Sequence, residues 1–331
     1  MRGGSAAVCV LLAVVSCQRE SEPAQDAATG ARDGGAAAPS AGPGGVAGEA
    51  LGLLQAGQLD EALARLDAST GDPEQLALLG AVWAKKAAAA PLPTPQAPPS
   101  PASRRATPAA APEFKPEELT ALGFVERALQ AQPGHGLASM VLAELLAPHA
   151  ARRFDLEKAA LARKRRGKAL DAAQPGDPDY SIQRVFGAFR DAVLGQPAAR
   201  EPVDRMFEFA LRVERLEDAQ WALDQLILRE RESPDPLVRY GDFLRDRKKE
   251  PHKAIERYRE ALIWKPDAEP ILERIADIYI SDGMAAFGKQ QWAVTEARLK
   301  EAKKYVKNPN SPQGLKIRDY ESRLASIRRA R

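Results

Sequence analysis

The side chains best suited to metal binding or nucleophilic chemistry are scarce in this chain of 331 residues, which has two cysteines and three histidines. His135, His149 and His252 stand apart from one another and from both cysteines, so none has the spacing of a zinc site. No H-E-x-x-H, G-x-S-x-G or G-x-x-x-x-G-K-[ST] pattern occurs; these patterns are the common signatures of metalloproteases, serine hydrolases and phosphate-binding loops. We therefore expect no enzymatic activity, no metal and no cofactor.

One cysteine, Cys17, has a context that gives its thiol a specific chemistry. A short positive start at Arg2 is followed by an apolar stretch at 6–15, which is too short to span a membrane and is typical of a secretory signal peptide. Val14-Val15-Ser16-Cys17 resembles the lipobox of bacterial lipoproteins, with Val in place of the usual Leu. The resemblance implies removal of residues 1–16 and attachment of diacylglycerol to Cys17. An ordinary signal-peptidase cut and a cytosolic protein with an apolar start are the alternatives.

The composition changes abruptly after Cys17. Residues 17–44 are mostly Ala, Gly, Pro, Ser, Asp and Glu, so we expect a disordered tether. Cys9 lies inside the signal, which leaves the mature chain without a disulfide. The net charge of +3 is too small to indicate nucleic acid as a partner. The lipoprotein resemblance, with Gln18 rather than Asp after the cysteine, implies a bacterial envelope protein anchored in the outer membrane and facing the periplasm.

From Val46 onward the sequence predicts an all-α fold. Ala, Leu, Arg and Glu dominate, apolar residues recur at i, i+3, i+4 and i+7, and Pro or Gly interrupts the pattern at short intervals. The clearest unit is PDPLVRYGDFLRDRKKEPHKAIERYREALIWKPDAEP, in which Ala254, Tyr258, Ala261 and Pro266 follow spacings of 4, 3 and 5. This resembles the tetratricopeptide repeat (TPR), where a small residue, an aromatic residue, a second small residue and a terminal proline take these places.

The TPR resemblance implies a role for each matching residue. The two alanines allow the second helix of the unit to approach the first closely, the tyrosine fills the space between repeats, and the proline ends the helix. First-helix residues sit one position early, so we expect one extra residue in the turn around 248–250. The residues expected to pack the repeat are Tyr240, Gly241, Leu244, Ala254, Tyr258, Ala261 and Pro266.

Weaker copies of the unit extend over 45–310, and the resemblance implies a TPR-like helix-pair solenoid of about five to six repeats. A proline-rich insertion at 91–116 is expected to join the two helices of one repeat. The unit that opens at Leu142 is expected to continue through 155–173, while an amphipathic helix at 178–195 has no assigned partner. Residues 311–331 are expected to form a capping helix. The alternative is a non-repetitive helical bundle.

Two further stretches have a functional and a structural interpretation. The basic run ARRFDLEKAALARKRRGK suits contact with anionic lipid or an acidic partner, but charged runs on helices are more often solvated faces. The proline-rich insertion suits a polyproline ligand, but such segments are more often spacers. We favour the structural interpretation of both.

These patterns favour a membrane-anchored scaffold or assembly factor that binds a protein or peptide partner in the envelope. The alternative is an enzyme-accessory subunit that acts on cell wall or lipid. The resemblance implies binding by first-helix side chains that face the groove of the solenoid. By position these are Glu208, Arg212, Asp242, Arg245, Glu273 and Asp277.

Overall fold

The structure is a computed structural model that describes residues 45–90, 114–164 and 179–329, all of them within one unit, Pro43–Arg331. Across these ranges the regular elements are helices and no strand occurs, so the all-α prediction is confirmed. The predicted signal peptide, Cys17 and the tether lie outside the described residues, as does most of the insertion at 91–116. The helices are α1 (Val46–Gln55), α2 (Leu59–Arg65), α3 (Pro73–Ala89), α4 (Pro116–Ala131), α5 (Gly136–Lys164), α6 (Ile182–Gly195), α7 (Glu201–Arg212), α8 (Leu216–Arg229), α9 (Asp235–Phe243), η2 (Leu244–Lys248), α10 (Pro251–Trp264), α11 (Glu269–Gly288), α12 (Trp292–Lys303) and α13 (Pro312–Arg329).

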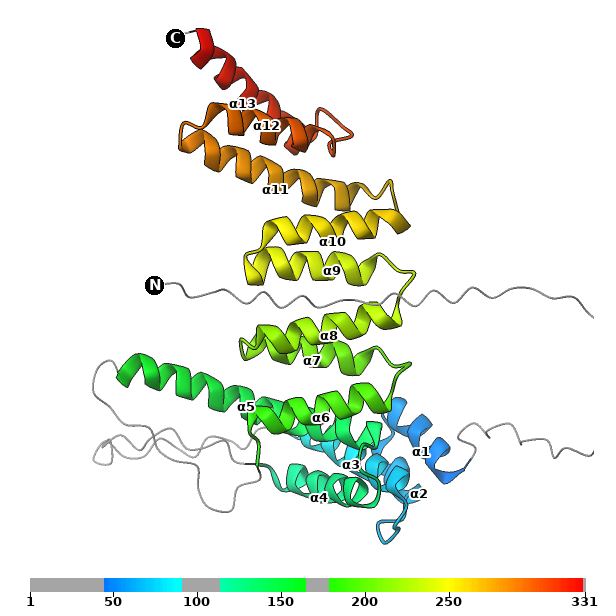
Figure 1. Ribbon diagram of the computed structural model, residues 1–331. Coiled ribbons are helices and arrows are strands. Elements are labelled where there is room, and N and C mark those ends of the chain that lie inside the picture. Colours follow the sequence, from blue (N-terminus) through cyan, green and yellow to red (C-terminus); the bar gives the residue numbers. More distant parts are fainter. Residues whose placement is uncertain (1–44, 91–113, 165–178, 330–331) are drawn as a thin grey trace, which may run out of the picture. The chain divides into compact units, whose positions relative to one another are not determined.

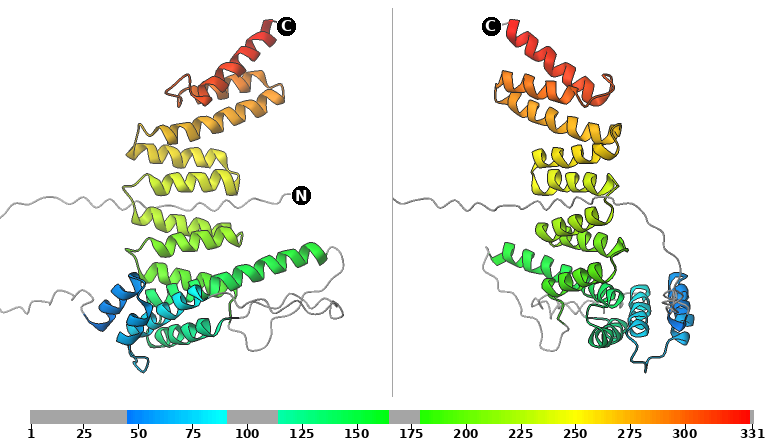
Figure 2. Two further views of the ribbon diagram at one scale, coloured as in Figure 1. Left: turned by 180° about the vertical axis from the view of Figure 1, so that it is seen from behind. Right: turned by 45° about the vertical axis from the view of Figure 1, so that its right-hand side comes forward.

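Neighbouring helices form pairs, each packed side by side. Within the described ranges there are six such pairs, α1 with α2 through α11 with α12, and from α6 onward the helices stack in chain order (Figures 1 and 2). The last helix, α13, packs against α11 and α12, where the capping helix was expected. Among these helices, none has the combination of length and hydropathy that a membrane crossing needs.

One pairing differs from the sequence prediction. Instead of turning back before 155–173, residues 136–164 form one continuous helix, α5, and its partner is α6, which had been left unassigned. Pro148 lies inside α5, where a proline removes one hydrogen-bond donor and usually breaks a helix. Leu146 and Ala150 on either side of it are almost fully buried. Packing on both sides of the proline therefore keeps the helix continuous despite the missing hydrogen bond.

The second helices share a common register. From α4 onward, each second helix carries three buried residues at spacings of 4 and 3, and none of these side chains is more than 2% exposed. The interval from one triplet to the next is 34 residues from α6 to α8, the period of a TPR, and 35 from α8 to α10. The triplets are Ala121, Val125 and Ala128; Val185, Phe189 and Ala192; Ala219, Leu223 and Leu226; Ala254, Tyr258 and Ala261; and Thr295, Leu299 and Ala302.

The extra residue in the fifth pair is absorbed by a wider helical turn. The residues after α9 form a π-helix, η2, and the turn closes with a bond of 2.9 Å from the Glu250 N–H to the Leu244 carbonyl, six positions back. In the corresponding turn of the next pair the Gln291 N–H reaches Ala286, five positions back, also at 2.9 Å. The predicted extra residue around 248–250 is thus confirmed.

The turns between paired helices also share a left-handed residue. Gly57, Glu214, Lys249 and Gln290 have φ values of 79°, 57°, 58° and 60°, and each follows the first helix of its pair. A left-handed residue at this place lets the backbone N–H groups that follow it bond the last carbonyls of the helix. Of these four turns, the first uses glycine, the residue that adopts this conformation without steric cost.

Close packing in the best repeat rests on Gly241 of α9 and Tyr258 of α10. A Cβ atom at Gly241 would lie 2.3 Å from Tyr258 Cε1, so the two helices meet where a side chain is missing. The tyrosine is fully buried and its hydroxyl donates to Asp242 at 2.7 Å. Of the other residues expected to pack this repeat, Tyr240, Leu244, Ala254 and Ala261 are buried, while Pro266 is exposed in the turn after α10.

Candidate functional site

An open groove of about 500 Å³ lies between the first helices α5 and α7, with one side chain contributed by α6. Its apolar lining includes Phe189 of α6 and Phe209 of α7, two nearly buried rings that are 2% and 6% exposed. On the α5 side the lining residues are Ala147, Pro148 and Ala151. The two alanines are one helical turn apart on the same face, and their short side chains leave space above the aromatic rings.

The rim of the groove carries charge, and its centre is Arg205 of α7. The guanidinium group of Arg205 lies 3.7 Å from Glu144 of α5, 3.8 Å from Glu201 and 3.8 Å from Glu208. All three separations exceed hydrogen-bond distance. One cation is therefore shared loosely by three carboxylates, which are 44%, 69% and 64% exposed.

A second arginine on the rim, Arg212, is fully engaged. Its guanidinium binds both carboxylate oxygens of Asp155 on α5, one of them at 3.0 Å. This hydrogen bond is the main reason that the pKa of Arg212 is raised. A bidentate pair of this kind fixes geometry as well as charge, so it ties α7 to α5 at one end of the groove.

Glu144 has two unusual features. Burial raises its pKa above the ordinary glutamate value, while the charges of Arg205 and Lys85 act in the opposite direction. In addition, Pro148 follows four residues later in the same helix and has no N–H, so the Glu144 carbonyl does not receive the usual α-helical hydrogen bond. Glu144 therefore combines a partly buried carboxylate with a backbone carbonyl that lacks its α-helical donor.

Of the six predicted groove residues, the structure brings Glu208 and Arg212 together on this groove. Asp242 and Arg245 lie elsewhere, within a hydrogen-bonded cluster. Besides the Tyr258 hydroxyl, Asp242 accepts from Arg274 Nε at 3.1 Å, and it pairs with Arg245 at 3.3 Å. These side chains already hold α9, α10 and α11 together.

The remaining two predicted residues lie on α11. Glu273 is partly buried and Asp277 is exposed. In the part of the chain that the structure describes, no ion pair joins either carboxylate to a basic side chain. They are free acidic groups on the last first helix rather than part of the groove between α5 and α7.

Arginines reach back from one first helix to the preceding one along the array. Counted along the chain, these arginines are 34 and 35 residues apart, which is the repeat interval. This period can be read from the sequence, but the prediction of groove residues from the family pattern does not include it. The pairs are Arg205 with Glu144, Arg239 with Asp204, and Arg274 with Asp242.

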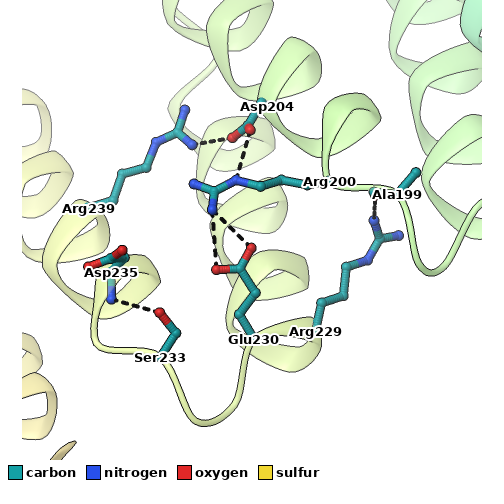
Figure 3. Close-up of polar contacts among 8 residues, drawn as sticks. All are labelled: Ala199, Arg200, Asp204, Arg229, Glu230, Ser233, Asp235 and Arg239. Carbon is teal, nitrogen blue, oxygen red and sulfur yellow. Dashed lines mark hydrogen bonds and ion pairs between the residues drawn. The ribbon is translucent and has the colours of Figure 1, made fainter.

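Figure 3 shows the polar contacts around one of these pairs, Arg239 with Asp204. Asp204 accepts from Arg200 Nε at 3.0 Å and from Arg239, while Arg200 also donates to both oxygens of Glu230 at 3.1 and 3.3 Å. In this junction between α7, α8 and α9, Arg200, Asp204, Glu230 and Arg239 each have a partner of opposite sign within hydrogen-bond distance, while Arg229 donates to the backbone carbonyl of Ala199. The four paired groups contribute to stability and have no spare charge for a ligand.

The histidines lie apart from one another, and each contacts neighbours of other types. His149 is 8% exposed, stacks on Phe114 with 3.8 Å between ring centroids, and lies 3.3 Å from Glu118. Burial lowers its pKa, and Glu118 opposes that shift. His135 accepts a backbone N–H through Nδ1 at 3.2 Å, and His252 faces one carboxylate at 3.5 Å. Among the described residues no group of three or more His, Cys, Asp and Glu side chains could hold a metal ion.

The chain matches no protein-family model and no curated protein, but solved structures resemble it. MamA is 16% identical with a TM-score of 0.32, over 62% of this chain and 92% of MamA. The human IFIT1 dimer with PPP-AAAA is 15% identical with a TM-score of 0.37, over 85% and 54%. PilF of Pseudomonas aeruginosa is 14% identical with a TM-score of 0.27, over 63% and 76%. These likenesses are distant. It is the shared register of the second helices, with intervals of 34 and 35 residues from α6 to α8 and from α8 to α10, that makes the described body of this chain TPR-like.

Proposed function

We propose that this protein is a non-catalytic scaffold that binds a protein or peptide segment in the groove between α5 and α7. The observation that supports it is the groove itself, in which almost fully buried aromatic rings lie under a charged rim. Binding surfaces of proteins commonly combine an apolar centre with a polar, solvent-accessible rim. Stacked helix pairs offer extended surfaces of this kind because each repeat adds another first helix to the same side.

Photo-crosslinking from the groove tests this proposal. A photoreactive amino acid replaces Ala151 in the full-length protein in its native cells, and a matched replacement of Leu228, which is 55% exposed on α8, serves as the control. We expect a discrete protein adduct from position 151 and none from 228. The Ala147→Arg substitution, which fills the groove, should remove the adduct while circular dichroism shows unchanged helix content. Equal adducts at both positions, or an adduct that persists after the groove is filled, would count against groove binding.

We further propose that the protein acts in the bacterial envelope as a lipoprotein of the outer membrane, facing the periplasm. The support is the sequence Val14-Val15-Ser16-Cys17 and Gln18 after it. One acyl chain gives only marginal membrane binding, so the several chains on a lipoprotein cysteine are needed for a stable anchor. Cys17→Ser should release the protein from sedimented membranes, whereas Cys9→Ser should not. A Cys17→Ser protein that stays as firmly bound as the wild type would refute the anchor.

A further inference from the structure

The charge on the groove is unbalanced toward the acidic side. Among the described side chains, Arg205 is the one cation that Glu144, Glu201 and Glu208 share, and it lies beyond hydrogen-bond distance from all three. The other rim cation, Arg212, is neutralised by its bidentate partner on α5. Lys85 also acts on Glu144, but its ammonium group donates to the carbonyl of Leu54 at 3.1 Å. The groove therefore has more carboxylate than its own cations satisfy.

The next two steps along the array do not share this imbalance. At the next two steps the carboxylates that receive the returning arginines are saturated, since Asp204 and Asp242 each accept two donors from the chain itself. At the α5–α7 step the guanidinium group of Arg205 lies 3.7 Å from the Glu144 carboxylate, which is beyond hydrogen-bond distance. An acceptor left in this state, in a partly desolvated place, gains more from an added cation than a fully solvated one does.

Backbone chemistry adds a second acceptor at the same place. Because Pro148 has no N–H, the Glu144 carbonyl lacks its α-helical donor, and both residues line the groove. Beneath these acceptors lie Phe189 and Phe209. A ligand that matches both features must donate hydrogen bonds and carry positive charge at one point, and must be apolar next to it.

Building on the proposed scaffold function, we infer that the groove binds a cationic amphipathic peptide segment, in which a Lys or Arg side chain lies next to an apolar anchor. The apolar stem of Lys or Arg packs on the two phenylalanines while its charged head reaches the Glu144 carboxylate and carbonyl. The neighbouring anchor fills the space above Ala147 and Ala151. A groove of about 500 Å³ has room for these two side chains.

Fluorescence anisotropy with the full-length protein and three synthetic 12-residue peptides tests the inference. One peptide is built from Lys and Leu, the second has Glu in place of Lys, and the third has Ser in place of Leu. At low salt we expect the Lys/Leu peptide to bind at least tenfold more tightly than either of the others. The double variant Glu144→Gln with Glu208→Gln should weaken that binding by about three- to tenfold, as expected for two partly exposed ion pairs. The matched control, Glu217→Gln with Glu232→Gln, removes two exposed carboxylates outside the groove and should leave it unchanged.

The outcomes separate this inference from the function on which it rests. Equal weakening by both double variants would mean non-specific charge attraction and would overturn the inference, as would preference for the Glu/Leu peptide. Either result leaves groove binding intact if position 151 still crosslinks to a cellular partner. If position 151 gives no adduct in cells and no peptide binds, the scaffold function itself fails.

Discussion

Alanine at two helical glycines is expected to change stability in opposite directions. Gly187 is exposed within α6 and has nothing within 4 Å of an added Cβ, so Gly187→Ala should raise the free energy of unfolding by about 0.5–1 kcal/mol. At Gly241 the same propensity gain applies, but the added Cβ would lie 2.3 Å from the ring of Tyr258. That ring is fully buried and fixed through its hydroxyl to Asp242, so it has no room to move away. Overpacking costs about 1–3 kcal/mol, and Gly241→Ala should therefore destabilise the protein.

Urea unfolding followed by circular dichroism measures both variants against the wild type. A second substitution identifies the cause: Tyr258→Leu should relieve the clash in the Gly241→Ala background, because Leu223 and Leu299 occupy the equivalent place in α8 and α12. Coupling between the two positions in a double-mutant cycle should exceed about 0.5 kcal/mol. If Gly241→Ala is as stable as Gly187→Ala, the close helix contact in this repeat is wrong.

Three further predictions concern stability. Gln290→Gly should stabilise the protein by about 0.5–1 kcal/mol and Gly57→Ala should destabilise it by at least as much, because both positions have a left-handed backbone; thermal unfolding that shifts the other way would contradict the turn geometry. Burial lowers the pKa of His149, so the unfolded chain binds the proton first as the pH falls; the stability contribution of the neutral histidine is full above about pH 6.5, the ordinary histidine pKa, and is lost as the pH falls below it. His149→Gln should therefore reduce the difference in the free energy of unfolding between about pH 7.5 and 5.5, and an unchanged difference would contradict this. Ala254→Leu should destabilise the protein by about 1–3 kcal/mol through overpacking at a fully buried site, whereas Ala325→Leu, at an exposed position of α13, should have little effect. Equal melting temperatures of the two variants would argue against the repeat register.

The sequence predicted the best-matching repeat because its signals are local. Ala254, Tyr258 and Ala261 lie on one face of a single helix, and a 4-and-3 spacing requires nothing from distant segments. The extra residue in the turn was equally visible, since it shifts the first-helix residues by one position. The structure adds how it is accommodated, by a π-helix whose wider turn takes up one residue.

Pairing of α5 with α6 could not be read from local signals. Pro148 is a strong helix-breaking residue in sequence, and the packing that overrides it comes from the neighbouring helices α3, α4 and α6. Residues 165–178 separate the two partners and lie outside the described residues, so no short turn marks them as a pair. Where tertiary packing decides a helix boundary, a rule based on one residue fails.

Some of the predicted groove carboxylates are free to bind a ligand and others are not, and the reason lies in the charge pairs along the whole array. A first-helix carboxylate has a choice of partners: a ligand, or an arginine that reaches back from the next repeat. The family pattern predicts that Asp242 faces the groove, but this carboxylate accepts a hydrogen bond from Arg274, which is 32 residues further along the chain. It also accepts from the Tyr258 hydroxyl, whose pKa is raised by burial and by that bond. Partly buried carboxylates that already accept two hydrogen bonds, as Asp242 does, stabilise the stack and are poor acceptors for a partner.

The same reasoning says where a second contact with a partner would lie. Asp277 is on α11, the last first helix before α13, and among the described residues no arginine forms an ion pair with it. If available acceptors determine binding, Asp277→Asn should weaken capture of the partner that crosslinks from position 151, whereas Asp242→Asn should lower the melting temperature, because it disturbs a bonded cluster. Quantitative crosslinking and thermal unfolding of the two variants separate the effects. Loss of capture in Asp242→Asn at full stability would show that position in the family pattern, and not the pairing within the array, decides which carboxylates bind.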